Sequence, residues 1–306
     1  MRASLLIAVG TAAAVGYGVA RVRPAVVIDE HAGHADHGAT GTGASAPAAP
    51  QGSPQGAALP ASRSAAAERI ASSPRHGEWV VVRTGPSDSV MTWLVYPERR
   101  DNAPVVVVIH ENRGLTTWVR GVADQLAAEG FIAIAPDLIT MERRDDLTHE
   151  LPPDSGGAAI RVLTNEWVLR ALDAVGKHAM ALPGARQTYG VVGFCWGGAR
   201  SFLHATHSPT LGAAVVYYGS PPTADQMAAI RAPVLGLYGG NDARINATIP
   251  ATDSTMRRLG KSYEYHIFDG AGHGFLGNQD GNPANRAASQ AAWPMTVAFL
   301  KAKLGG

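Results

Sequence analysis

Gly193-Phe194-Cys195-Trp196-Gly197-Gly198 joins a predicted strand over residues 188–192 to a predicted helix over residues 199–206. The same order, strand followed by helix, recurs on both sides of this turn. Upstream, residues 105–109 form an unbroken run of β-branched residues, which is typical of a strand buried on both faces. Alternating strands and helices of this kind predict an α/β fold with a doubly wound, mostly parallel sheet and helices on both faces.

The remaining elements fit that architecture. Hydrophobic patterning and turn residues predict strands over 79–83, 90–96, 105–109, 131–135, 188–192, 213–217, 234–238 and 263–268, and helices over 117–129, 158–180, 199–206 and 284–303. The first two strands flank Gly85-Pro86-Ser87-Asp88, so we expect them to pair antiparallel at one edge of the sheet.

The turn around Cys195 carries the strongest chemical signal. A glycine-x-nucleophile-x-glycine turn between a strand and a helix is the nucleophile elbow of α/β-hydrolases, here with cysteine in place of serine. Side chains at positions 193 and 197 would collide with neighbouring backbone in so tight a turn. The N-terminus of the following helix favours a thiolate. The alternative is a structural cysteine buried in a glycine turn.

Downstream residues supply an acid and a base in the chain order that this fold uses. Asp242 follows the strand at 234–238, and His273 follows the strand at 263–268. Both therefore fall at the carboxyl ends of predicted parallel strands, the edge where α/β sheets build their sites. The alternatives are that Asp242 caps a helix and that His273 is an ordinary loop histidine. Asp269 is a competing carboxylate, but it is too close to His273 in sequence to reach it easily.

The loop His110-Glu111-Asn112-Arg113-Gly114 follows the strand at 105–109. In this fold that loop provides one amide of an oxyanion hole and the residue after the nucleophile provides the other, so Asn112 and Trp196 are the expected donors. A carboxylate directed at a catalytic thiol suggests a role for Glu111 in proton transfer. The alternative is a structural salt bridge of Glu111 with Arg113 or Arg143.

Together these motifs resemble the dienelactone hydrolase (carboxymethylenebutenolidase) family, over about three quarters of the chain. The resemblance implies a Cys195–His273–Asp242 triad, with Glu111 acting on the thiol proton and no metal or organic cofactor. It implies a carboxylic ester hydrolase that acts on a small ester or lactone. We expect the substrate to lie near four residues, Arg113, Tyr218, Arg244 and Phe275.

One position departs from the family pattern. The resembling enzymes carry a carboxylate-binding arginine four residues after the catalytic histidine, and this chain has Gly277 there. Without that arginine, we expect small neutral activated esters or lactones to be hydrolysed at least as well as carboxylated dienelactones. Arg113 and Arg244 lie in nearby loops and are the candidates to replace the missing cation.

Composition excludes several classes of protein. With 26 Lys and Arg against 25 Asp and Glu, the net charge is +1, which argues against a nucleic-acid partner. A single Cys excludes an internal disulfide framework and a cysteine-rich zinc module. We expect a monomer. Two other functions stay open, a general exported carboxylesterase or thioesterase and a catalytically silent binding protein of the same fold.

The N-terminal quarter differs from the rest. Residues 1–22 are predicted to be a signal peptide or, uncleaved, an N-terminal membrane anchor, so we expect an exported protein, either periplasmic, secreted or anchored facing outward. Residues 23–73 are rich in Ala, Gly, Ser and Pro and are predicted to be a disordered tether, followed by the catalytic domain at 74–306. His31, His34 and His37 in the tether have spacing that could bind Zn²⁺ or Cu²⁺ loosely, although a solvated tract without function is the alternative.

Overall fold

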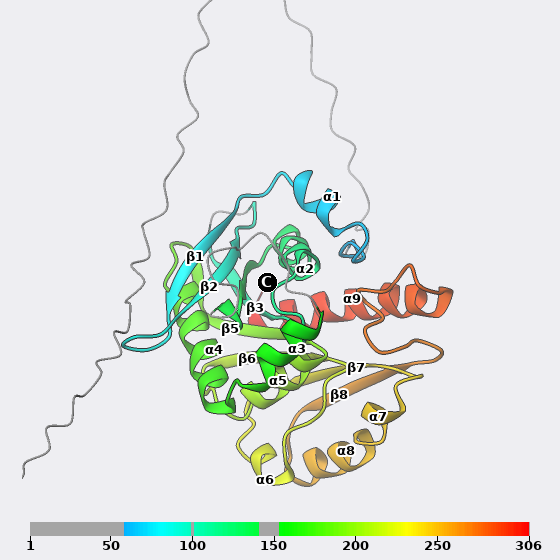
Figure 1. Ribbon diagram of the computed structural model, residues 1–306. Helices are drawn as coiled ribbons and strands as arrows, with labels where there is room; N and C mark the ends of the chain where they lie inside the picture. The colour runs from blue at the N-terminus through cyan, green and yellow to red at the C-terminus, as the bar shows by residue number, and fades with distance from the viewer. Residues whose placement is uncertain (1–57, 99–100, 141–152, 306) are drawn as a thin grey trace, which may run out of the picture. The chain divides into compact units, whose positions relative to one another are not determined.

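The computed structural model describes residues 58–98, 101–140 and 153–305. Within these residues one sheet has the strand order β1-β2-β4-β3-β5-β6-β7-β8 (Figure 1). Its strands are β1 Gly77–Arg83, β2 Ser89–Val95, β3 Ala103–Ile109, β4 Ile132–Pro136, β5 Ala185–Phe194, β6 Leu211–Tyr217, β7 Val234–Gly239 and β8 Tyr263–Phe268. The pairs β1–β2 and β2–β4 are antiparallel, and the pairs from β4 through β8 are parallel. The predicted mostly parallel α/β sheet with an antiparallel edge is confirmed.

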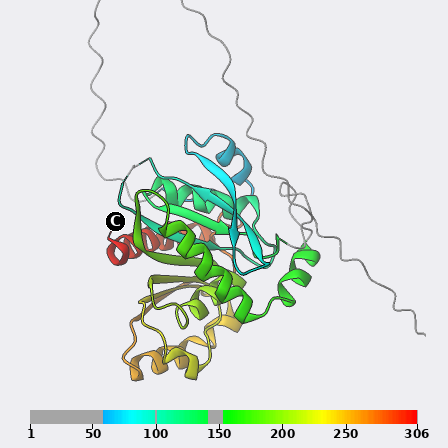
Figure 2. The same cartoon turned by 90° about the vertical axis from the view of Figure 1, so that its left-hand side faces the viewer.

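Helices cover both faces of the sheet (Figures 1 and 2). The described helices are α1 Ala66–Ala71, α2 Thr117–Ala128, α3 Pro153–Arg161, α4 Asn165–Met180, α5 Trp196–His204, α6 Ala224–Met227, α7 Ala243–Asn246, α8 Ile249–Arg258 and α9 Pro283–Leu304. Helices α2 and α9 contribute to the core on one face, and α4, α5 and α8 contribute to the core on the other. The valines of β3 alternate between the two cores, with Val106 and Val108 in one and Val105 and Val107 in the other. This two-sided burial explains the continuous β-branched run in the sequence.

The predicted helix over 158–180 is wrong in one respect, because the structure has two helices there. Helix α3 ends at Arg161 and α4 begins at Asn165. Between them Thr164 adopts an extended conformation with ψ of 149°, and its hydroxyl accepts a hydrogen bond from the amide of Trp167 at 3.2 Å. Threonine competes for backbone hydrogen bonds in this way and therefore caps a new helix instead of continuing the old one.

Residues 58–73 were placed in the disordered tether, and the structure contradicts this. They are described as an extended segment followed by the short helix α1, which packs against α2. Ala66 is buried, and Leu59 packs against the core beneath α2 and α9. The small residues of this segment allow it to lie flat on the domain, which low-complexity composition alone does not reveal.

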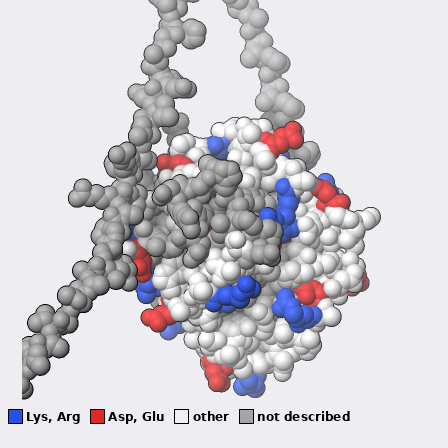
Figure 3. Space-filling view, in the orientation of Figure 1, with Lys and Arg blue, Asp and Glu red and all other residues white. Residues whose placement is uncertain are grey.

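The predictions for the first 57 residues lie outside the described residues. They comprise the export segment or anchor, most of the tether and the metal-binding tract at His31, His34 and His37. Among the described helices none combines the length and the hydropathy needed to cross a membrane. Basic and acidic side chains are interspersed over the described face in Figure 3.

The register of the parallel strands sets where the site forms. Ile109 of β3 lies beside Gly193 of β5, and Phe194 of β5 lies beside Tyr217 of β6. Strands β7 and β8 continue this alignment to Gly239 and Phe268. The loops that leave these strands therefore meet at one edge, and they carry Glu111, Cys195, Tyr218, Asp242 and His273.

Candidate active site

Cys195 lies at a strained position between β5 and α5. It has φ of 56° and ψ of −114°, an uncommon conformation for a non-glycine residue, and its side chain makes no cap hydrogen bond to α5. A Cβ at Gly193 would strike the carbonyl of Gly197, and a Cβ at Gly197 would strike the carbonyls of Ile109 and His110. Both collisions agree with the expected elbow. Such backbone strain costs on the order of 1–3 kcal/mol, and it holds the half-buried Cys195 at the start of the helix.

His273 lies between Cys195 and Asp242. Its Nδ1 is 2.5 Å from Oδ2 of Asp242, and its side chain interacts electrostatically with that of Cys195. The interaction with Cys195 and the contact with Asp242 stabilise the imidazolium, and they raise the pKa of His273 to about 9 although burial acts in the opposite direction. The three side chains therefore form a connected chain in the predicted order. Asp269 is exposed on the loop before His273.

Asp242 caps a helix and also contacts His273. Its Oδ2 contacts His273, and its Oδ1 accepts a hydrogen bond from the amide of Ile245 at 3.5 Å as the N-cap of α7. The side chain is almost fully buried. Capping fixes the carboxylate in the orientation that the imidazole requires.

Glu111 forms a salt bridge, but with a residue that the sequence argument did not consider. Its Oε1 is 2.7 Å and its Oε2 2.5 Å from Nη2 of Arg63, in the segment before α1. Arg63 therefore takes the place proposed for Arg113, and the proposed partner Arg143 lies outside the described residues. The carboxylate is only 10% exposed, so its charge is compensated mainly by this pair.

The two expected oxyanion donors lie on adjacent backbone segments. The close approach of Gly197 to the carbonyl of His110 brings the first turn of α5 against the Glu111 loop. That loop is a turn closed by the hydrogen bond from the Gly114 amide to the Glu111 carbonyl, which does not use the amide of Asn112. The first amides of α5, including that of Trp196, have no acceptor within the helix.

His110 supports this arrangement from below. Its Nε2 accepts a hydrogen bond from the amide of Leu138 at 3.1 Å, so Nδ1 carries the proton and donates to the carbonyl of Glu111 at 2.6 Å. The ring also stacks on Trp196, with centroids 5.4 Å apart. A buried histidine thus connects the Glu111 loop to the start of α5.

Of the expected substrate contacts, Tyr218 lies at the site. It is fully buried, has φ of 41°, and its ring centroid is 5.0 Å from that of His273. Within the described part of the chain its hydroxyl has no hydrogen-bond partner. Burial and the nearby charge of Glu111 raise the pKa of Tyr218 well above its usual value, so the hydroxyl stays protonated and can donate.

Phe275 is a core residue, contrary to the prediction of a substrate contact. It is fully buried, and its ring packs against Tyr217, Tyr218 and Phe268 with centroids 5.4–5.9 Å apart. Aromatic clusters of this kind are packing features. Phe275 therefore supports Tyr218 from behind instead of facing the site.

Arg113 and Arg244 were the candidates to supply a cation near Gly277. Arg113 is half-buried, and its backbone packs against Gly156 of α3. Arg244 is exposed on α7, and among the described residues no hydrogen bond or ion pair joins it to Cys195 or His273.

The cation at that place is Arg63. A Cβ at Gly277 would lie 2.6 Å from Cζ of Arg63, so the guanidinium fills the space that a side chain at 277 would need. Neither of the two candidate arginines takes that place, because a residue 214 positions earlier in the chain supplies the cation. Sequence reasoning missed Arg63, and the one signal that could have found it was a lone charge in an almost uncharged segment.

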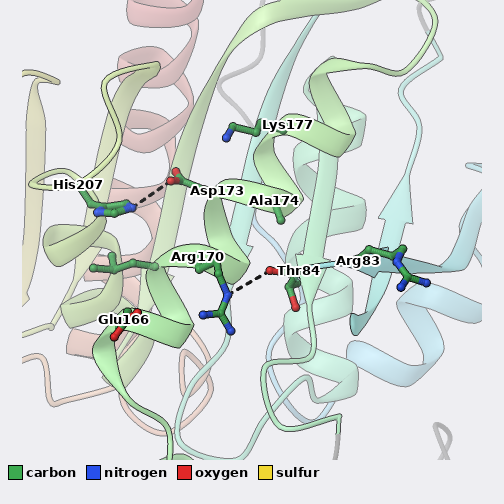
Figure 4. A pocket seen from close by; sticks show the side chains of 9 residues that line it. Arg83, Thr84, Glu166, Arg170, Asp173, Ala174, Lys177 and His207 are labelled. Atoms are coloured by element: carbon green, nitrogen blue, oxygen red, sulfur yellow. Dashed lines mark hydrogen bonds and ion pairs between the residues drawn. The ribbon is translucent and has the colours of Figure 1, made fainter. Parts of the chain in front are cut away.

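A cavity of about 680 Å³ lies elsewhere, between α4, the β1–β2 turn and the end of α5 (Figure 4). Two of its charged lining groups are paired with neighbouring residues. Arg170 donates to the carbonyl of Thr84, and His207 pairs with Asp173. In the described chain no cluster of three or more His, Cys, Asp and Glu is suited to hold a metal ion.

Three comparisons with known proteins show which family and fold the chain resembles. The sequence model described as "Dienelactone hydrolase family" matches residues 90–304. A protein of Salmonella typhimurium named "Putative carboxymethylenebutenolidase" is 32% identical over 232 residues, which cover 72% of this chain and 84% of that one.

Solved structures show the same fold. A crystal structure titled as a "Putative Dienelactone Hydrolase" from Klebsiella pneumoniae has a TM-score of 0.65 and 27% identity, covering 74% of this chain and 98% of that one. The dienelactone hydrolase of Anabaena variabilis has a TM-score of 0.57 and 20% identity, covering 75% and 99% of the two chains, and it supports the fold alone. The chain is therefore a hydrolase that belongs to the dienelactone hydrolase family.

Proposed function

We propose that the protein hydrolyses small esters or lactones by covalent catalysis, with Cys195 as nucleophile, His273 as base and Asp242 as the residue that orients His273. One observation carries the proposal. The strained Cys195 interacts electrostatically with His273, and Nδ1 of that histidine contacts a buried carboxylate at 2.5 Å. This is the arrangement of nucleophile, base and orienting acid that activates a weak nucleophile.

In the resting pair the proton lies on His273, whose pKa is raised to about 9, and in the first half-reaction the Cys195 thiolate attacks the carbonyl carbon of the substrate. The amides of Trp196 and Asn112 stabilise the negative oxygen, a contribution of about 3 kcal/mol per donor. The carbon–oxygen bond of the leaving group then breaks, and His273 donates its proton to the departing alkoxide. The product of this step is a thioester on Cys195.

In the second half-reaction His273 removes a proton from water, which attacks the thioester and releases the acid. The Cys195 sulfur leaves as a thiolate, which again pairs with the imidazolium of His273. Glu111 was an alternative base for the thiol, but Arg63 contacts both of its oxygens. His273 is the better placed base because it interacts electrostatically with Cys195.

The substrate we propose is a small activated ester or a strained lactone, since thiolates acylate readily but cleave unactivated esters poorly. Uncharged substrates should react at rates comparable to those of carboxylated dienelactones. A cation, Arg63, is present, but its donors already bind Glu111 and Asn278, so it gives a substrate carboxylate little advantage.

The test is kcat/KM for a short-chain aryl ester beside that for a dienelactone, with Cys195→Ala as the inactive control. We expect values within about tenfold of each other. A preference for the dienelactone above about 100-fold, equivalent to about 2.7 kcal/mol, would show that a substrate carboxylate displaces Glu111 from Arg63. An absence of turnover on every ester and lactone would overturn the proposed function itself.

A further inference from the structure

The segment before α1 is bound to the loop that carries His273. We call residues 58–66 the strap. The amide of Arg63 donates to the carbonyl of Gly277 at 2.9 Å, Gln279 donates to the carbonyl of Pro60 at 2.8 Å, and Ser64 donates to Asp280 at 3.0 Å. Three bonds over five residues of the strap fix it along the loop that follows the histidine.

Arg63 reaches from the strap into the site. Its guanidinium contacts both oxygens of Glu111, donates to Asn278, and lies 4.9 Å from the ring centroid of Trp118. Its side chain is 27% exposed, so the pair with Glu111 is shielded from water on most sides. Burial lowers the pKa of Arg63, but Glu111 outweighs this effect and the pKa is raised overall.

Gly277 makes this arrangement possible. A side chain at 277 would overlap the guanidinium, with its Cβ only 2.6 Å from Cζ. The strap and the glycine therefore fit each other, although they are separated by more than two hundred residues. The strap also lies before residue 90, where the family match begins.

From these contacts we infer that the strap is part of the active site and that Arg63 is a positioning residue. Arg63 acts through two neighbours. It fixes the carboxylate of Glu111 and neutralises its charge at the sheet edge that carries Cys195, and it holds the loop at Gly277 and Asn278 that follows His273. This inference rests on the proposed function, and it adds a residue from outside the family-matched region to the machinery.

Three groups interact electrostatically with Cys195: His273 after β8, Tyr218 after β6 and Arg63 on the strap. A fourth charged group, Glu111 after β3, pairs with Arg63 and lies in a loop at the same sheet edge. Removing the cation alone leaves the carboxylate of Glu111 uncompensated at the edge that carries Cys195, whereas removing both charges restores a neutral surrounding. This difference separates a positioning role from a merely structural one.

The experiment uses the full chain and compares Arg63→Ala with Arg69→Ala. Arg69 is the matched control, since it lies on α1 next to the strap and makes its side-chain bond to Gln125, away from the site. On a neutral aryl ester, Arg63→Ala should lower kcat/KM by about 10- to 100-fold, mainly through kcat, because a misplaced group slows the chemical step. Arg69→Ala should stay within about twofold, and Arg63→Lys should recover part of the loss because it keeps the charge but not the fork of donors.

Alkylation of Cys195 by iodoacetamide, measured against pH, is the second readout and needs no substrate. Arg63→Ala should move the midpoint of the rate profile upward by about one pH unit, and Glu111→Gln should move it downward. The double variant Arg63→Ala/Glu111→Gln should return close to wild type. If Arg63→Ala does not fold, as judged by its thermal melt, the double variant and Arg63→Lys carry the test.

The inference is overturned if Arg63→Ala matches Arg69→Ala in both readouts. It is also overturned if Arg63→Ala causes the same loss in the Glu111→Gln background as in the wild type, because the two residues would then act independently. If the wild type hydrolyses no ester or lactone, the proposed function fails while the alkylation profiles still decide the role of Arg63.

Discussion

Helix α5 begins and ends next to a histidine–aspartate pair, and the two pairs differ in every property that matters for chemistry. At its start, Cys195 contacts His273, whose Nδ1 is 2.5 Å from Asp242. At its end, Nε2 of His204 is 3.7 Å from Asp173. His273 has a side chain that is 34% exposed, whereas His204 is completely buried.

The two histidines respond to these surroundings in opposite directions. Interactions with Cys195 and Asp242 raise the pKa of His273 to about 9. Burial lowers the pKa of His204 to about 4, because Asp173 compensates only part of the lost hydration. Its Nε2 is instead 2.7 Å from the hydroxyl of Tyr189.

Proximity of a histidine to an aspartate therefore does not identify a catalytic pair. The pair becomes chemically useful where the contact is direct and a nucleophile lies on the opposite nitrogen. The cavity in Figure 4 lies near the C-terminal end of α5, beside Asp173. It does not lie at the N-terminal end of that helix, which carries Cys195. Concavity and ionisable groups alone would have pointed to the wrong end.

Replacing Cys195 with alanine should have the largest effect on this comparison. Turnover of an aryl ester should fall by about 10⁴-fold or more, because the covalent route is lost. The thermal melt should show that the variant is folded. If the variant kept near-wild-type turnover, a water-based hydrolysis would have to replace the mechanism.

Asp242→Asn should cost less, about 10³-fold in kcat, because it removes the orientation and charge stabilisation of His273 but leaves the nucleophile. It should also move the alkaline limb of kcat/KM below the wild-type value near pH 9, since loss of the carboxylate lowers the pKa of His273. A pH–rate profile of both proteins measures this shift. An unchanged limb would mean that Asp242 does not set the protonation of His273.

His204 should make the folded state sensitive to acid. Its pKa is about 4 in the folded state against 6.5 in the unfolded chain, so the unfolded state binds more protons between these values. The contribution of neutral His204 to the unfolding free energy is fully present above pH 6.5 and is lost as the pH falls toward 4. This loss is on the order of 3 kcal/mol.

Urea unfolding of the wild type and of His204→Gln at several pH values tests this prediction. In His204→Gln the unfolding free energy should fall less between pH 6.5 and 4. Its kcat/KM at neutral pH should stay within about twofold of the wild-type value. His266→Gln is the control, since that partly exposed histidine lies on β8 beside Glu264. Equal acid sensitivity of wild type and His204→Gln would contradict the assignment.

The smallest expected effect is the opposite pH dependence at the other end of the helix. The pKa of His273 is raised from 6.5 to about 9, so its contribution to stability is fully present below pH 6.5 and is lost as pH rises through 9. The difference in unfolding free energy between wild type and His273→Gln should therefore shrink over that range. A difference that grows with pH would reverse the sign of the comparison.

Much of this molecule was predictable from local sequence patterns. The β-branched runs predicted the strands, and the turn at Cys195 with the loops at Asp242 and His273 predicted which side chains would meet. These predictions succeed because strand periodicity and chain order determine which loops share a sheet edge.

Two of the failures depend on long-range packing, and the third depends on one local side-chain bond. Arg63 lies in a segment whose composition resembles a disordered tether, and its partners are 48 and more residues away. The environment of Phe275 depends on rings from three other positions, and the helix break at Thr164 depends on a single side-chain bond. The sequence shows only that position 277 has no side chain. That the guanidinium of Arg63 fills the space there becomes visible only in the folded chain.

The positive φ of Cys195 has an evolutionary consequence. Glycine adopts that backbone conformation without penalty, so a chain released from selection for chemistry would gain stability by exchanging its nucleophile for glycine. In the absence of selection for activity, a Cys195→Gly substitution would therefore give an inactive but more stable protein. A cysteine that persists there in a population is maintained by what it does, at the expense of how firmly the protein folds.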